Sequence, residues 1–278
     1  MYAAAMSLAG VAKETVAIVE RGSYTSPSGQ VVSIAAAIEA ARRGTRLYRP
    51  EELADLPLPP AGAGAPRIEV WAETTAGAAR RLVEGEGLAD VAALNFASAK
   101  NPGGGFLGGA KAQEEDLARC SALYHCVREA RGYYDANRAC DSLLYTDHII
   151  YSPGVPFFRD ERLDLLERPF CAAMVTAPAP NAGEHLRRHA RGHAEIREAL
   201  VRRAGHVLRV MAHHGHRTLV LGAWGCGVFR NDPKEVAAAF AGWLRSEAFA
   251  RAFARVVFAV FDRSKDRSTL RAFELAFA

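Results

Sequence analysis

The stretch Asn101-Pro-Gly-Gly-Gly-Phe-Leu-Gly-Gly-Ala-Lys-Ala-Gln-Glu-Glu115 joins a glycine-rich loop directly to two carboxylates. Five of the eleven residues from 102 to 112 are glycine. Glycine loses the most conformational freedom on folding, so a loop of this composition is costly to order and usually holds a ligand. Its backbone amides can converge on an anion, and the helix expected from about Gln113 would add its positive dipole end. The stretch therefore predicts phosphate binding beside acid–base chemistry.

The composition of the chain is that of an ordinary globular protein. Its 278 residues, half of them hydrophobic, can bury a full core and form one large domain, or one domain with an appendage. A net charge of +4, from 35 basic and 31 acidic residues, is too small to favour binding to duplex DNA. Five widely spaced cysteines without a C-x-x-C pair indicate reduced thiols in a cytoplasmic protein and argue against a disulfide framework or a zinc site.

Two other features have simple interpretations. The alanine-rich start is interrupted by Lys13 and Glu14, so we expect neither a signal peptide nor a membrane anchor. His213, His214 and His216 lie near the end of a helical pattern. Cations are favourable at a helix C-terminus, so this interpretation is preferred to a metal site.

The chain divides near residue 66. Residues 1–48 show helical patterns around a turn at 22–29, and the proline-rich link that follows cannot extend a helix. We therefore expect an N-terminal helical extension with a proline-rich connector over 1–66 and a catalytic domain over 67–278. Strands are expected over 68–74, 91–97, 148–152, 174–177, 218–221 and 256–261, most of them separated by helices.

This alternation predicts an α/β fold with a largely parallel sheet and helices on both faces. Such sheets bind ligands beyond the carboxyl ends of their strands. Two glycine-rich loops fall at that position, one after the strand 91–97 and one after the strand 218–221. The second, Gly222-Ala-Trp-Gly-Cys-Gly-Val-Phe-Arg-Asn-Asp232, precedes a helix start with Pro233 at the first position and a capping box completed by Glu235. It is either a tight turn or, with the first loop, one side of a diphosphate site.

Known nucleotide motifs fit the first loop poorly. Gly103 to Gly108 matches G-x-G-x-x-G, but no acidic residue follows about twenty positions later to hold a ribose. Lys111 is not followed by Ser or Thr, so the loop is not a P-loop. A nicotinamide dehydrogenase and an ordinary NTPase are both disfavoured.

Glu114 and Glu115 admit two interpretations. Acidic residues in a first helical turn commonly complement the dipole, which lowers the carboxylate pKa and suits a base or a charge stabiliser. A proton donor at this position would need desolvation, its neighbour's charge or a bound diphosphate to raise the pKa. The two side chains leave a helix about 100° apart, so they cannot address one atom equally.

The motifs together resemble a family. Gly103-Gly-Gly, seven residues and then Gln113-Glu-Glu is similar to the signature of the bacterial-type poly(ADP-ribose) glycohydrolases, which have the macrodomain fold. The segments Asn95-Phe-Ala-Ser-Ala-Lys-Asn-Pro, Gly-Cys-Gly-Val-Phe229 and Phe-Asp262 occur in the order that this family shows.

The resemblance implies exo-acting hydrolysis of ribose–ribose O-glycosidic bonds in poly(ADP-ribose), releasing ADP-ribose without a metal or a cofactor. It implies that Glu115 is the catalytic acid and that Glu114 binds the substrate ribose. The loop from Gly225 would close over the diphosphate, with Phe229 packing on a sugar or base. The substrate-binding residues implied are Asn95, Asn101, Gly103, Gly104, Gly105, Gly108, Gly109, Gln113, Gly225, Cys226, Gly227, Val228 and Phe229.

Two rival functions stay open, a non-catalytic ADP-ribose reader and a hydrolase of mono-ADP-ribosylated side chains or acetylated ADP-ribose. The expected partner is poly(ADP-ribose) or ADP-ribose, with no DNA and no membrane, and we expect a cytoplasmic monomer. Thr74, Thr75 and Phe261 are candidate contacts of the adenine.

Overall fold

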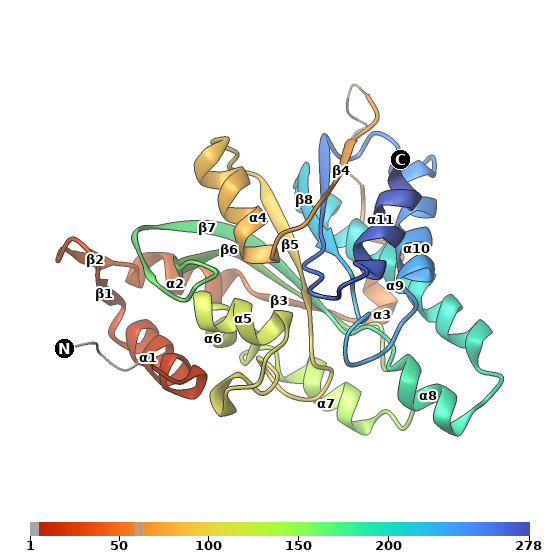
Figure 1. The fold of residues 1–278 in the computed structure, drawn as a ribbon, viewed down its shortest axis with the longest axis horizontal. Helices are drawn as coiled ribbons and strands as arrows, with labels where there is room; N and C mark the ends of the chain where they lie inside the picture. The colour runs from red at the N-terminus through yellow and green to blue at the C-terminus, as the bar shows by residue number, and fades with distance from the viewer. Residues whose placement is uncertain (1–5, 59–61, 63) are drawn as a thin grey trace.

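The computed structural model describes residues 6–58, 62 and 64–278, and a seven-stranded mixed sheet lies at its centre (Figure 1). The strand order is β3-β6-β7-β5-β8-β9-β4. The strands are β3 (Arg46–Tyr48), β4 (Arg67–Trp71), β5 (Val91–Phe96), β6 (Ile149–Arg159), β7 (Leu165–Ala177), β8 (Thr218–Gly222) and β9 (Arg255–Ala259). The run from β7 to β4 is parallel, whereas β3, β6 and β7 pair antiparallel. The predicted α/β fold with a largely parallel sheet is confirmed.

Both faces of the central strands are buried, which explains their nearly continuous apolar sequences. In β5, Ala92 and Leu94 pack into one hydrophobic core, while Val91 and Ala93 pack into the other. The alternation follows from the two-residue period of a strand. Helices therefore cover each face of the sheet, as the sequence predicts.

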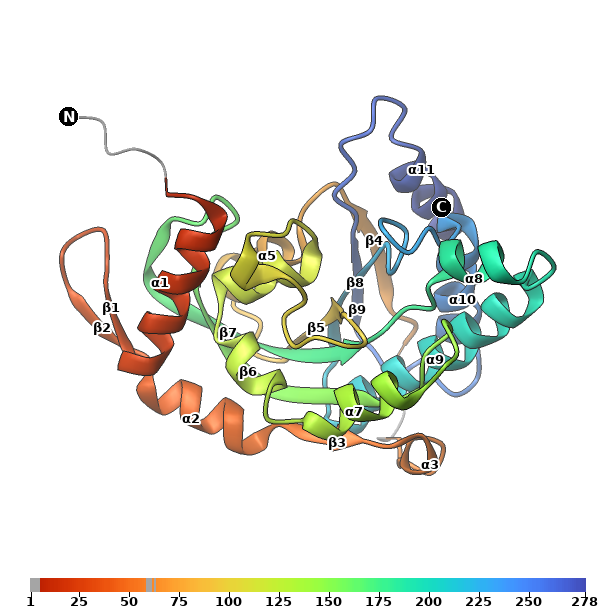
Figure 2. The same cartoon turned by 90° about the horizontal axis from the view of Figure 1, so that it is seen from below.

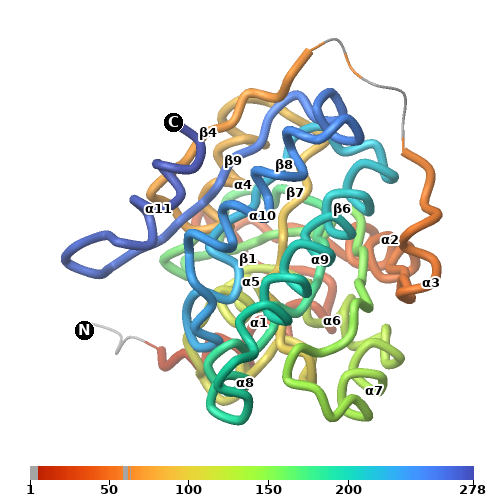
Figure 3. The backbone as a smooth tube through the Cα atoms, turned by 90° about the vertical axis from the view of Figure 1, so that its right-hand side faces the viewer, coloured from red at the N-terminus to blue at the C-terminus, as the bar shows by residue number. Residues whose placement is uncertain are grey.

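The helices divide between the two faces. Figure 3 looks onto the side where α8, α9 and α10 lie. The helices that contribute to the first core are α3 (Pro50–Leu53), α8 (Ala182–Arg188), α9 (His193–His213), α10 (Pro233–Arg245) and α11 (Ser268–Phe277). Those that contribute to the second are α1 (Leu8–Arg21), α2 (Ala35–Gly44), α4 (Thr75–Arg80), α5 (Gln113–Cys120), α6 (Leu123–Val127) and α7 (Arg131–Ala139).

The N-terminal segment contains more strand than its helical pattern predicts. A hairpin of β1 (Ser23–Thr25) and β2 (Val31–Ser33) projects beside α1 (Figure 2), and Ser28 Oγ donates to Glu167 of β7 at 2.7 Å. The edge strand β3 belongs to the central sheet. The predictions for residues 1–5 and for Pro59 and Pro60 of the connector lie outside the described residues. The first parallel strand, β4, begins at Arg67, and the predicted boundary after residue 66 stays a prediction.

The two strands β6 and β7 form a long hairpin that the sequence analysis did not predict. It expected only short strands at 148–152 and 174–177. Pro153, Gly154 and Pro156 lie within β6, where they interrupt the apolar pattern. The structure accommodates these residues with a register shift between the pairs of Ser152 and Val155. Residues 161–163 of the hairpin's turn line the cavity of the candidate active site.

The helices of the described ranges include none that is both long enough and apolar enough to span a membrane.

Candidate active site

The two glycine-rich loops face each other because β5 and β8 are neighbouring parallel strands. Their carboxyl ends meet at one edge of the sheet, as predicted. A cavity of about 880 Å³ lies between the loops. The predicted site residues that line it are Asn101, Gly104, Gly105, Gln113, Glu114, Glu115, Gly225, Cys226, Gly227, Val228 and Phe229.

Four of the predicted site residues, Asn95, Gly103, Gly108 and Gly109, do not line the cavity. Asn95 is fully buried below it and donates from Nδ2 to Glu114 Oε1 at 3.3 Å. Gly109, with φ 83°, packs against the backbone of α1 near Ala9. Any role of these four in binding stays a prediction.

The amides of the first loop mostly serve the protein itself. Gly104 N donates to Asn101 O at 3.0 Å, and Gly108 N donates to Gly105 O at 3.1 Å. Gly105 N donates to Glu115 Oε1 at 2.9 Å. These N–H groups therefore shape the loop and hold a carboxylate, and their convergence on a phosphate stays a prediction.

Helix α5 begins at Gln113, as predicted, and the side chain of that residue ties the helix to the sheet. Its Oε1 accepts from Phe96 N at 2.8 Å, and its Nε2 donates to Leu94 O at 2.8 Å and to Thr75 Oγ1 at 3.0 Å. With the amide so engaged, Gln113 fixes the helix start at the end of β5.

Glu114 is buried at the floor of the cavity. Ser98 N donates to its Oε2 at 2.7 Å, and Asn95 holds its Oε1. Burial raises the pKa of Glu114 to about 8. The hydrogen bonds from Ser98 and Asn95 act to lower this pKa, and the nearby charge of Glu115 acts to raise it. The expected lowering by the helix dipole is not seen, because desolvation outweighs it.

Glu115 leaves the helix toward the first loop. Its exposed fraction is 9%, and it lines the cavity. Oε1 accepts the hydrogen bond from Gly105, whereas no hydrogen bond to a described residue uses Oε2. One oxygen of this carboxylate is therefore free for a ligand in the cavity.

The second loop differs from the first because several of its backbone N–H groups have no partner among the described residues. No hydrogen bond to the described residues uses the backbone N–H of Gly225, Gly227, Val228 or Phe229. The buried Asn231 holds the loop from within, because its Nδ2 donates to Pro180 O at 2.8 Å and to Gly225 O at 3.0 Å. Successive unpaired N–H groups at a cavity wall form an anion-binding surface.

The helix after this loop starts largely as predicted. Asp232 caps α10 by accepting from Lys234 N at 2.9 Å, and Pro233 is the first helical residue. The predicted capping box is wrong, because Glu235 pairs instead with Arg197 of α9 at 2.8 Å.

The first loop and α5 rest on α1. Thr15 Oγ1 donates to Arg119 O, at the end of α5, at 2.8 Å, and Leu8 lines the cavity. Ala12 of α1, Phe106 of the loop and Ala118 of α5 form a small separate core. The N-terminal segment thus supports both the first loop and the helix that carries Glu115.

Other lining residues lie outside the predicted catalytic and substrate-binding set. Thr74, Thr75 and Phe261, named as adenine candidates, all line the cavity. Asp262, noted only for its place in a motif, lines it too and accepts from Thr269 N at 2.9 Å. Further lining residues that the sequence analysis did not single out include Leu8, Glu73, Asp116, Glu161, Arg162, Leu163, Arg263 and Thr269.

The charged lining of the cavity is predominantly acidic. The acidic members are Glu73, Glu114, Glu115, Asp116, Glu161 and Asp262, and the basic ones are Lys111, Arg162 and Arg263. A bound diphosphate would therefore depend on backbone N–H groups more than on basic side chains.

The histidine cluster lies at the end of α9 and its bonds are internal to the protein. His214 Nε2 bonds Tyr48 OH at 2.8 Å, and His216 Nε2 bonds Tyr151 OH at 2.8 Å. Within residues 6–58, 62 and 64–278, no three His, Cys, Asp or Glu side chains are grouped so that they could hold a metal ion.

Comparison with known proteins gives consistent results. Residues 12–160 match the family model "Microbial-type PARG, catalytic domain". A crystal structure of poly(ADP-ribose) glycohydrolase (PARG) from Thermomonospora curvata is 52% identical, with a TM-score of 0.91, and the match covers 97% of this chain and 99% of that chain. The same enzyme bound to the inhibitor ADP-HPD matches with a TM-score of 0.90, 52% identity and the same coverage.

A PARG from Deinococcus radiodurans in complex with ADP-ribose is 49% identical, with a TM-score of 0.81, over 86% of this chain and 96% of that chain. A search of curated proteins found no match. The family model covers more than half of the chain, and the solved structures are similar over most of its length. The chain therefore belongs to the microbial-type PARG family.

Proposed function

We propose that the protein is a poly(ADP-ribose) glycohydrolase that releases ADP-ribose from the ends of the polymer. The observation that carries this proposal is the pair of carboxylates, Glu114 and Glu115, at the floor of a cavity walled by two glycine-rich loops. Relatives of about 50% identity are named for this activity, and one of them was crystallised with ADP-ribose. Exo action rests on the family resemblance.

Glu115 is the proposed catalytic acid. Its Oε1 is held by Gly105 N, so the free Oε2 can protonate the leaving ribose oxygen and afterwards accept a proton from the attacking water. The hydrogen bond to Gly105 fixes the orientation of the carboxyl group without occupying both oxygens.

Glu114 is the proposed ribose-binding residue. With a pKa of about 8 it holds a proton at neutral pH and can donate one hydrogen bond to a sugar hydroxyl. As Glu115 gives up its proton, its carboxylate can stabilise the positive charge that develops at the anomeric carbon. This division of roles follows from burial: Glu114 lies deeper than Glu115, with exposed fractions of 2% and 9%.

The second loop is the proposed diphosphate site. The free N–H groups of Gly227, Val228 and Phe229 point to anion binding, and the ring of Phe229 is available for packing on a sugar or base. Gly104 and Gly105 would lie along the ribose with Asn101, while Thr74, Thr75 and Phe261 form the proposed adenine end. Asn95, Gly103, Gly108, Gly109 and Gln113 are proposed to support this site, and Cys226 to line it.

We also propose that the protein is a cytoplasmic monomer that binds neither DNA nor a membrane. The five cysteines are free thiols, which agrees with a reducing compartment. No step of the proposed reaction requires a metal or a cofactor, since two carboxyl groups and water suffice.

The test is product analysis with the purified protein in EDTA. Defined poly(ADP-ribose) and a singly ADP-ribosylated protein are offered separately, and products are followed by chromatography. The proposal predicts free ADP-ribose from the polymer and no release from the single modification. Release only from the singly modified protein would indicate a mono-ADP-ribosyl hydrolase, and polymer binding without any product would indicate a reader.

A further inference from the structure

The segment that joins α7 to β6, residues 140–148, lies behind the second loop of the site and contains a residue in an unfavourable conformation. Tyr145 has φ 60°, in the left-handed region. Residues other than glycine rarely adopt this conformation, and bulky ones least of all. It persists only where the surrounding structure holds it in place. Tyr145 does not line the cavity, so any role in the reaction must act through another residue.

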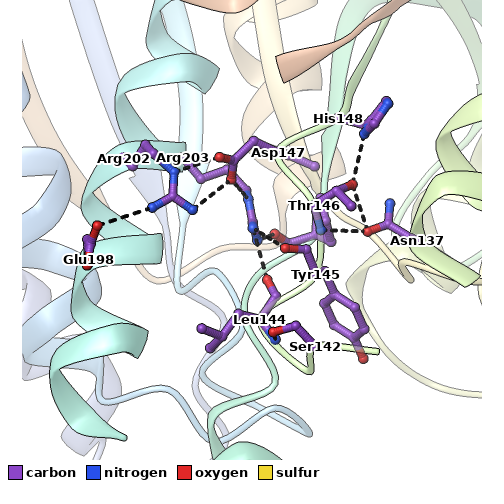
Figure 4. Close-up of polar contacts among 12 residues, drawn as sticks. Asn137, Ser142, Leu144, Tyr145, Thr146, Asp147, His148, Glu198, Arg202 and Arg203 are labelled. Atoms are coloured by element: carbon purple, nitrogen blue, oxygen red, sulfur yellow. Dashed lines mark hydrogen bonds and ion pairs between the residues drawn. The ribbon is translucent and has the colours of Figure 1, made fainter. Parts of the chain in front are cut away.

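Arg203 of α9 holds the backbone on both sides of this residue. Its side chain is fully buried. Its Nη2 donates to Leu144 O at 2.9 Å and to Tyr145 O at 3.2 Å, and its Nη1 donates to Pro178 O at 2.6 Å. Nε pairs with Asp147 at 2.8 Å. Figure 4 shows Arg203 beside Leu144, Tyr145 and Asp147 of the segment. Through Pro178, the same guanidinium group connects the segment to the residue that follows β7.

A second set of bonds fixes the other side of the segment. Asn137 Oδ1 of α7 accepts from Thr146 N at 2.9 Å and from Thr146 Oγ1 at 3.0 Å. Asp147 also pairs with Arg202 at 2.6 Å. Figure 4 shows the ring of Tyr145 pointing away from this network. The network therefore constrains the backbone and leaves the ring to contact something else.

The ring of Tyr145 contacts Phe229 of the second loop. The two ring centroids are 5.9 Å apart at an interplanar angle of 45°. Phe229 is also held through its backbone, because its carbonyl accepts from Gly183 N at 2.9 Å. The neighbouring Val228 is 83% exposed, and a Cβ on Gly227 would meet nothing within 4 Å. Phe229 is therefore the anchored point of an otherwise open loop end.

We propose that Tyr145, held in its left-handed conformation by Arg203, is a positioning residue for Phe229 and thereby for the anion-binding amides of the second loop. The proposal rests on the proposed function only in that the cavity takes an ADP-ribose unit. Tyr145 lies on the side of the second loop, whereas the carboxylates belong to α5. Its loss is expected to weaken binding and to leave the bond-breaking step nearly intact.

The test compares two substitutions of Tyr145. Tyr145→Phe keeps the ring, and Tyr145→Asn removes it but tolerates the left-handed conformation, so strain does not confound the result. Tyr24→Leu is the control, because Tyr24 contacts Phe158 at the same centroid distance of 5.9 Å, and neither residue lines the cavity. The measurements are KM and kcat on polymer, affinity for ADP-ribose by calorimetry, melting temperature, and amide hydrogen exchange at Gly183 and Arg230.

Those two amides report on the loop without any ligand, since Gly183 N donates to Phe229 O and Arg230 N to Gly227 O. For Tyr145→Asn we expect KM and the dissociation constant to rise about 3- to 10-fold, as the loss of an aromatic pair implies. We expect kcat to stay within about twofold and both amides to exchange faster. Tyr145→Phe is expected to match the wild type, and Tyr24→Leu to lower only the melting temperature. We expect the double variant Tyr145→Asn with Phe229→Leu to lose less binding free energy for ADP-ribose than the sum of the losses in the two single variants.

Unchanged KM and unchanged exchange at Gly183 and Arg230 in Tyr145→Asn would overturn the proposal. So would a fall in kcat matched by a loss of stability, since that indicates a merely structural role. A wild type that neither hydrolyses polymer nor binds ADP-ribose would contradict the proposed function, while the exchange measurement still decides whether Tyr145 positions the loop.

Discussion

Gly104 and Glu115 are in such close contact that the glycine leaves no room for a side chain. A Cβ placed on Gly104 would overlap Oε1 of Glu115 and lie 3.0 Å from its Cδ. Gly104 also has φ 59°, a conformation that disfavours other residues. The glycine-rich loop is thus shaped to accommodate a carboxylate of the following helix.

We expect Gly104→Ala to reduce turnover by about 100-fold, because a displacement of Glu115 by even about 1 Å misplaces the proposed acid. Gly108→Ala is the matched comparison, since a Cβ there meets nothing within 4 Å and its φ is not in the left-handed region. A much smaller loss is expected for it. Steady-state kinetics on polymer check both variants, and equal losses would show that the Gly104–Glu115 contact is not what matters.

Glu114 makes stability depend on pH. Its folded-state pKa of about 8 lies above the ordinary value of 4.5. Between these values the unfolded chain has released a proton that the folded protein still binds, so the free energy of unfolding falls as the pH rises and the loss is complete above about pH 8.

We therefore expect Glu114→Gln to be more stable relative to wild type at pH 9 than at pH 5. Urea unfolding from pH 5 to pH 9 measures the difference, with the same change at the exposed Glu274 as a control. A constant difference across this range would mean that Glu114 ionises normally.

The second loop has a similar pair of glycines. Gly225 has φ 73° and no space beside Ala179 and Asn231, whereas Gly227 has open space. Gly225→Ala is expected to displace the loop and to weaken ADP-ribose binding by about 10-fold, a loss of about 1.4 kcal/mol. Gly227→Ala is expected to weaken it far less. Calorimetry with ADP-ribose checks this order, and the reverse order would contradict it.

Arg202 and Arg203 are adjacent on α9 and pair with the same carboxylate, but their surroundings differ. The Arg203 side chain has no exposed surface, whereas that of Arg202 is 44% exposed. Arg203→Met removes one of the two partners of Asp147 and leaves three backbone carbonyls without this donor, so we expect a loss of about 3–5 kcal/mol in unfolding free energy. Arg202→Met is expected to cost about 1 kcal/mol or less. Chemical denaturation measures both, and similar costs would refute this distinction.

The sequence predicts the layout of the site well because glycine spacing and helix-start signals are local. The strand ends before both loops, the start of α5 at Gln113 and the start of α10 at Pro233 all appear where the pattern indicates them. These features depend on backbone conformation and capping, which neighbouring residues largely determine.

What the sequence does not predict depends on contacts between distant segments. The raised pKa of Glu114 arises from burial, which no local pattern reveals. The β6–β7 hairpin brings Glu161 and Arg162 to the cavity only because a register shift accommodates Pro153 and Gly154. The use of the first loop's amides within the protein is likewise a tertiary result, because Gly105 N donates to a side chain ten residues away.

The assignment of Glu115 as catalytic acid is tested most directly by comparing Glu115→Gln with wild type in two measurements, turnover of poly(ADP-ribose) and calorimetric binding of ADP-ribose. Glutamine keeps the shape of the side chain and an acceptor for Gly105 N but cannot deliver the proton. We expect turnover to fall by about 10³-fold or more while ADP-ribose binding stays within about threefold. Turnover close to that of the wild type would contradict the central role assigned to Glu115.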